Sequence, residues 1–78
     1  MGACHNTIDL ADLAAFAANV RAAREASGFT QEDVADRSGI HPTEVSRIER
    51  GLRDPRISTV LRLAKALDVP PSSLIDGA

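Results

Sequence analysis

Apolar residues recur along this chain every three or four positions, and glycine or proline interrupts the pattern at intervals. The spacing predicts four helices, which run from about Asp9 to Ala26, from Thr30 to Gly39, from Pro42 to Gly51 and from Ser58, as the N-cap, to about Leu67. Residues 71–75 can form one further helical turn after the Pro70-Pro71 break. No segment alternates as a strand does, so the predicted fold class is all-α, a compact bundle of about five short helices.

The inner faces of the two longest predicted helices are apolar apart from one charge. The residues of the first helix that are predicted to face the core are Leu10, Leu13, Phe16, Ala17, Val20, Ala23 and Ser27. Those of the fourth helix are Ile57, Val60, Leu63, Ala64 and Leu67. Arg24 falls on the inner face of the first helix, where an unpartnered guanidinium is costly to bury. Arg24 therefore needs a carboxylate partner or must reach solvent.

Only residues 39–41 join the second and third predicted helices, and the positions around this turn are filled in a specific way. Thr30 and Asp33 have the spacing of a capping box. Gly39 occupies the turn position that requires a positive φ, and the small residue Ala35 lies where the two helices cross. The inward positions of the unit hold Val34, Ser38, Ile40, Val45 and Ile48. This arrangement predicts a helix-turn-helix over about residues 30–50.

Length and composition exclude several function classes. The chain has 78 residues, enough for one domain, and its single cysteine, Cys4, cannot form an internal disulfide, so we expect a cytoplasmic protein. No apolar run approaches the ~20 residues that span a membrane. One cysteine and two histidines do not complete a metal site, and the glycines are too scattered for a phosphate-binding loop. We expect no metal, no cofactor, no small-molecule ligand and no enzyme activity.

The net charge of −2 conceals a local excess of positive charge. Residues 41–57 carry four arginines against three acidic residues. The third predicted helix carries a polar stripe at i, i+3, i+4 and i+7, made of Thr43, Ser46, Arg47 and Arg50. Val45 and Ile48 lie on the opposite side, so the stripe faces either water or a polyanion.

Three stretches of the chain resemble the Cro/lambda-repressor (Xre-type) DNA-binding domain, namely Phe29-Thr30-Gln31-Glu32-Asp33-Val34-Ala35, Gly39-Ile40 and Val45-Ser46-Arg47-Ile48-Glu49-Arg50-Gly51. The resemblance continues through Arg53-Asp54-Pro55 and Leu63-Ala64-Lys65-Ala66-Leu67, and it covers about residues 16–76. It implies a lambda-repressor-like bundle whose third helix enters the major groove of DNA. It also implies a largely buried salt bridge between Arg24 and Glu49 that orients this helix.

The resemblance implies a sequence-specific regulator of transcription, a repressor or small controller protein, that binds double-stranded DNA at a pseudo-palindromic operator. The residues expected to contact bases are Thr43, Ser46 and Arg47. The residues expected to contact phosphates are Gln31, which matches the glutamine of the family, and Thr30, His41, Arg50, Arg53 and Arg56. Three of these have a second interpretation, because Thr30 and His41 suit helix caps and Arg50 suits a local ion pair.

A regulator that reads DNA with one helix per subunit gains specificity by pairing, so we expect a two-fold homodimer. The predicted interface consists of Leu61, Val69, Leu74 and Ile75, and the region around Leu10 and Leu13 is the competing surface. The expected organisation is a flexible segment over residues 1–8, the DNA-binding domain over residues 9–76 and a tail of residues 77–78.

Two other functions stay open from the sequence. A module of the same fold could bind a protein rather than DNA, as an antirepressor or antitoxin, and the negative net charge favours this alternative. The chain could also be the DNA-binding fragment of a larger regulator.

Overall fold

Five helices account for most of residues 10–77, the part of the chain that the computed structural model describes. They are α1 (Leu10–Ala26), α2 (Gln31–Ser38), α3 (Pro42–Glu49), α4 (Ile57–Leu67) and α5 (Pro71–Ile75). No strand occurs within this range, in agreement with the predicted all-α class. Residues 1–8, which include Cys4 and His5 and are expected to be a flexible segment, lie outside the described residues. The last residue of the predicted tail, Ala78, also lies outside them.

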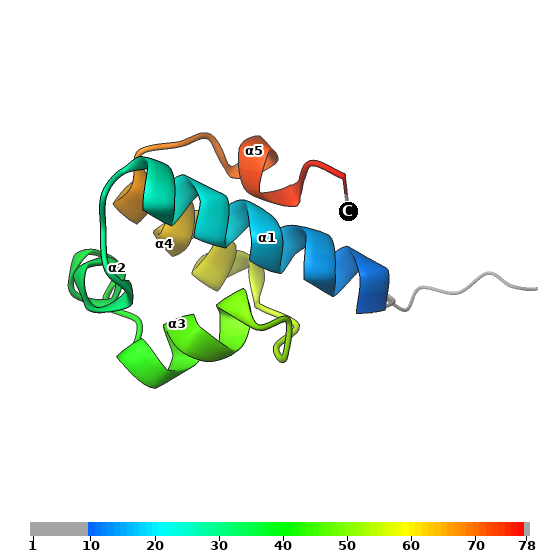
Figure 1. Cartoon of the computed structure of the whole chain (residues 1–78), viewed down its shortest axis with the longest axis horizontal. Helices are drawn as coiled ribbons and strands as arrows, with labels where there is room; N and C mark the ends of the chain where they lie inside the picture. The colour runs from blue at the N-terminus through cyan, green and yellow to red at the C-terminus, as the bar shows by residue number, and fades with distance from the viewer. Residues whose placement is uncertain (1–9, 78) are drawn as a thin grey trace, which may run out of the picture.

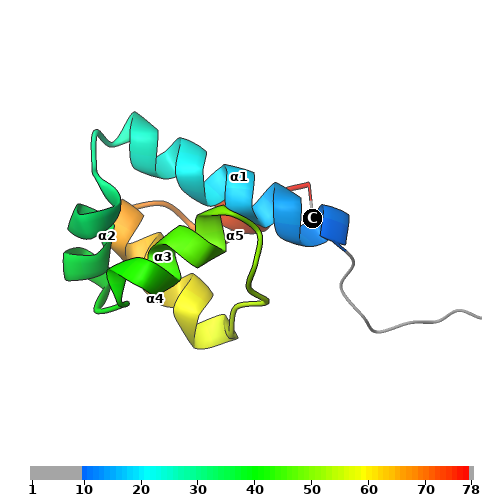
Figure 2. The ribbon, with the colours of Figure 1, turned by 60° about the horizontal axis from the view of Figure 1, so that its bottom comes forward.

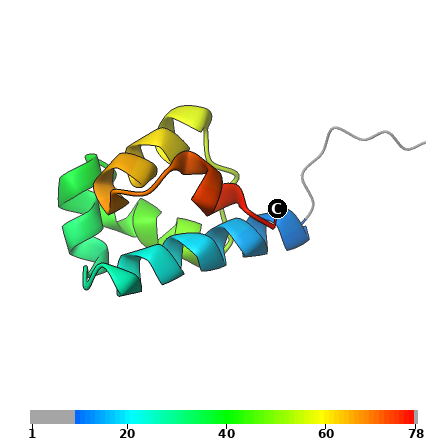
Figure 3. The ribbon, with the colours of Figure 1, turned by 90° about the horizontal axis from the view of Figure 1, so that it is seen from above.

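The long helix α1 organises the bundle. It packs against α3, α4 and α5, and α2 packs against both α3 and α4 (Figure 1). Viewed from above, α4 and α5 lie along one side of α1 (Figure 3). The side chains that are fully buried at the centre are Val20, Val34, Val45, Ile48, Leu63, Leu67 and Leu74. Every one of the five helices contributes to this core, and α3 is packed against it by α1 and α2.

The side chain of Arg37 joins α2 to α4. Its Nε donates a hydrogen bond to the backbone oxygen of Ala66 at 2.8 Å, and its guanidinium carbon lies 4.5 Å from the centre of the Phe29 ring. A guanidinium over an aromatic face is attracted by the ring quadrupole. Arg37 therefore fixes α2, the first helix of the helix-turn-helix, against the neighbouring α4.

The structure corrects one expected helix start and three expected inner-face positions; one of these, Ser27, is exposed just beyond the end of α1. The helix α4 begins at Ile57 with Arg56 as the N-cap, rather than with Ser58 as the N-cap, and Arg56 makes no side-chain capping bond. The side chains of Leu10 and Ile57, expected on inner faces, are 80% and 75% exposed. Both residues are the first of their helix, where the bundle no longer covers the apolar stripe. None of the described helices is long and apolar enough to cross a membrane.

Candidate nucleic-acid interface

Local capping interactions set the angle between α2 and α3. Thr30 Oγ1 accepts the backbone N–H of Asp33 at 3.0 Å, and Asp33 Oδ2 accepts the backbone N–H of Thr30 at 2.8 Å, which completes the expected capping box. Gly39 ends α2 with φ of 76°, a left-handed conformation that glycine adopts without steric cost. His41 then caps α3, because its Nδ1 accepts the backbone N–H of Thr43 at 3.1 Å.

The side of α3 that faces away from the core carries the predicted base-contact residues. Thr43 and Arg47 are exposed and Ser46 is half-buried, while Val45 and Ile48 are buried beneath them. Among the described residues, the guanidinium of Arg47 has no hydrogen-bond or ion-pair partner. The last turn of α3 therefore presents a free cation, the group that binds the O6 and N7 atoms of guanine in the major groove.

Three further arginines surround this face in different ways. Arg50 Nε donates to the backbone oxygen of Ser46 at 3.3 Å, so Arg50 folds back along α3 rather than forming an ion pair with an acid. Arg53 Nε lies 3.2 Å from Glu44 Oε1, and both side chains are partly exposed. An exposed pair of this kind contributes little to stability but holds the loop guanidinium beside the first turn of α3. Arg56 is exposed at the start of α4.

The carboxylate of Glu49 is the most buried charge in the described part of the chain, and it lies on the core side of α3. Arg24 Nε and Nη2 donate to its two oxygens at 2.7 and 3.0 Å, and Arg24 Nη1 donates to the backbone oxygen of Phe29 at 3.0 Å. The side chains of Glu49 and Arg24 are 1% and 15% exposed. The hydrogen bond to Glu49 raises the pKa of Arg24 above its usual value. The expected salt bridge is thus present, as a two-point contact that ties α1 to α3.

Glu49 also contacts two further residues, one at the start of α2 and one on α1. Gln31 Nε2 donates to Glu49 Oε1 at 3.1 Å, a contact that we did not predict for this expected phosphate ligand. Arg21 Nη2 donates to the backbone oxygen of Glu49 at 3.2 Å, and Arg21 Nε lies 3.9 Å from Glu49 Oε1. Sequence reasoning missed Arg21. Its spacing of three residues from Arg24 would have placed both on one side of α1.

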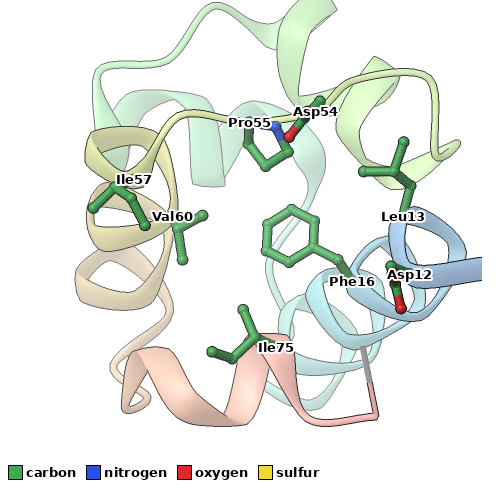
Figure 4. Close-up of a pocket in the computed structure, with 8 residues that line it drawn as sticks. All are labelled: Asp12, Leu13, Phe16, Asp54, Pro55, Ile57, Val60 and Ile75. Carbon is green, nitrogen blue, oxygen red and sulfur yellow. The ribbon is translucent and has the colours of Figure 1, made fainter. Parts of the chain in front are cut away.

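The predicted dimer interface requires correction. Leu74 is fully buried in the core, because α5 folds against α1 and α4, so it is not available to a partner. Val69 is half-buried and packs against the core. Leu61 and Ile75 remain exposed. Ile75 lines an apolar cavity of about 160 Å³ together with Ile57 and the ring of Phe16 (Figure 4).

Comparison with known proteins identifies relatives of this architecture. The Helix-turn-helix family model matches residues 20–74. Control protein C.SmaI of Serratia marcescens is 39% identical over 59 residues, which cover 76% of this chain and 70% of that protein. The chain spans only 26% of a longer HTH-type regulator from Sinorhizobium fredii, with 40% identity over 50 residues.

Two solved structures are similar to the whole bundle. The restriction-modification controller protein C.AhdI from Aeromonas hydrophila has a TM-score of 0.80 and 41% identity, covering 82% of this chain and 97% of that one. The controller protein C.Esp1396I was solved as a tetramer in complex with its natural 35 base-pair operator. It has a TM-score of 0.76 and 29% identity, and the match covers 87% of each chain.

Proposed function

The chain belongs to the helix-turn-helix family, and from that premise we propose that it is a sequence-specific regulator of transcription that binds double-stranded DNA as a homodimer. The observation that carries the proposal is the free guanidinium of Arg47 on the exposed side of α3, flanked by Thr43 and Ser46. A helix of this kind fits the major groove and reads base edges with its outward side chains. The resemblance to an operator-bound controller protein supports the same conclusion.

The proposed mechanism separates base reading from phosphate binding. Arg47 binds guanine, and Thr43 contacts a thymine methyl group or accepts a hydrogen bond from a base. Arg53 and Arg56 bind phosphates and fix the position of α3 in the groove without reading sequence. No residue has a catalytic role in this proposal, and the protein works in the cytoplasm with the DNA.

Selection of duplexes from a random pool, followed by affinity measurements, tests the proposal. One enriched palindrome supports a dimeric DNA reader, whereas no enrichment above the starting pool contradicts it and favours the protein-binding alternative. Arg47→Ala should then lose about 1–3 kcal/mol of discrimination at particular base pairs, while Arg56→Ala should weaken binding to all duplexes alike. Arg62→Ala, on the exposed side of α4, is the matched control and should leave the preferred sequence unchanged. A uniform loss of affinity in Arg47→Ala with an unchanged preferred sequence would show that Arg47 does not read bases.

A further inference from the structure

Arg21 is a cation on α1 that the proposed base and phosphate contacts leave unused. Its side chain is 52% exposed, although it touches the C-terminal end of α3 through the Glu49 backbone oxygen. Figure 2 shows α1 running beside α3 along the length of the bundle. Arg21 lines a surface hollow between α1 and the end of α3, together with Glu49 and Arg50.

Three side chains, those of Arg24, Gln31 and Arg21, approach the Glu49 carboxylate, and only Arg24 neutralises its charge. Arg24 satisfies both oxygens at short distance. Arg21 Nε, in contrast, lies 3.9 Å from Oε1, too far for a good hydrogen bond. One carboxylate charge is therefore balanced by Arg24, and the positive charge of Arg21 is left in excess at this site. A polyanion that approaches the site meets a net positive charge.

Gln31, the expected phosphate ligand at the start of α2, lies beside Arg21. Both side chains approach the same oxygen, since Gln31 Nε2 is 3.1 Å and Arg21 Nε is 3.9 Å from Glu49 Oε1. The two nitrogens are therefore within about 7 Å of each other, a span that one phosphate group bridges with two hydrogen bonds of ordinary length. The exposed half of the Arg21 side chain leaves it free to turn toward such a group.

We infer that Arg21 and Gln31 together bind one phosphate of the DNA backbone, which extends the DNA contact from the helix-turn-helix onto α1. This inference rests on the proposed function, because the phosphate belongs to the duplex that α3 reads. Glu49 is then a positioning residue, since its carboxylate accepts the amide of Gln31 and its backbone oxygen accepts the guanidinium of Arg21. Because a phosphate carries no sequence information, the contact adds affinity equally for all duplexes.

The test is the salt dependence of duplex binding for Arg21→Gln. This variant removes the charge but keeps a side chain that can donate to the Glu49 backbone oxygen. Loss of one phosphate contact lowers the slope of log K against log salt by about 0.9, so that between about 50 and about 200 mM salt the affinity falls about 3.5-fold less than for wild type. Arg21→Lys keeps the charge and should keep most of the slope. Arg62→Gln makes the same change in net charge on the outer side of α4 and should bind with the wild-type slope.

The outcomes separate this inference from the proposed function. A duplex recovered by selection and a random-sequence duplex serve as probes, and circular dichroism verifies that each variant is folded. If Arg21→Gln is folded and keeps the wild-type slope, Arg21 is only a structural contact of α3 and the inference is wrong. If the slope falls by the same amount in Arg62→Gln, the effect is general electrostatics, which also overturns the inference. Wild type that binds no duplex at all overturns the proposed function itself.

Discussion

Removing Arg24 should destabilise the protein far more than removing any exposed arginine. In Arg24→Gln the Glu49 carboxylate stays 1% exposed but loses both short hydrogen bonds from the guanidinium. Its remaining partners are the neutral amide of Gln31 and the distant Arg21. Breaking a buried pair from one side costs about 3–5 kcal/mol, because an uncompensated charge is left in the interior.

Replacing Glu49 should cost less stability than replacing Arg24, its partner in the salt bridge. Glu49→Gln leaves a guanidinium that is already 15% exposed and still donates to the Phe29 backbone oxygen. The new amide oxygen can also accept one hydrogen bond from Arg24. We therefore expect a loss of about 1–3 kcal/mol in Glu49→Gln, smaller than that in Arg24→Gln.

Urea denaturation monitored by circular dichroism measures both losses. A chain of this length has a total stability of about 4–12 kcal/mol, so Arg24→Gln should lose a large share of it and should unfold at a much lower urea concentration. Arg53→Gln is the control, because it breaks the exposed pair with Glu44 and should cost no more than about 1 kcal/mol. A loss in Arg24→Gln as small as that in Arg53→Gln would refute the argument from burial.

The capping box and the dimer surface give two further predictions. The hydrogen bond from the backbone N–H of Thr30 lowers the pKa of Asp33, so this carboxylate stabilises the fold above its unfolded pKa of about 3.9 and the benefit is lost as pH falls through the folded value. Asp33→Asn should therefore be less stable than wild type at pH 7 in urea denaturation, with a difference that shrinks under acid; a constant difference would contradict this. For the dimer, Leu61→Asp with Ile75→Asp should shift sedimentation from dimer to monomer while leaving a folded chain, because both side chains are exposed. A variant that still dimerises would place the interface elsewhere.

The helix-turn-helix could be predicted from the sequence because its determinants are local. Thr30 and Asp33 are three residues apart, and Gly39 needs only its own φ to end α2. The stripe on α3 follows from helical periodicity once the helix has a start, which Pro42 supplies. Each of these features depends on neighbours within one or two turns, and the structure agrees with all of them.

The errors concern residues whose environment depends on distant parts of the chain. Leu74 belongs to a five-residue helix, which by itself is too short to bury a side chain. Asn19 of α1 holds this segment in place, because its Nδ2 donates to the backbone oxygens of Leu74 and Asp76 at 2.9 and 2.7 Å. These contacts join residues more than fifty positions apart in the chain, so periodicity does not predict them. The Gln31–Glu49 hydrogen bond was missed for the same reason.

The buried Arg24–Glu49 pair should affect DNA binding separately from its contribution to stability. Replacing both Arg24 and Glu49 by methionine removes two charges from a largely buried site, and exchanges of this kind are often neutral or stabilising. We expect the double variant to recover most of the stability that Arg24→Gln loses. It should nevertheless bind duplex DNA more weakly than wild type, because the double variant has no carboxylate to accept the Gln31 amide and orient it at the start of α2. Stability in urea with reduced affinity would show that the carboxylate positions Gln31 for DNA binding, whereas wild-type affinity would show that packing alone is sufficient.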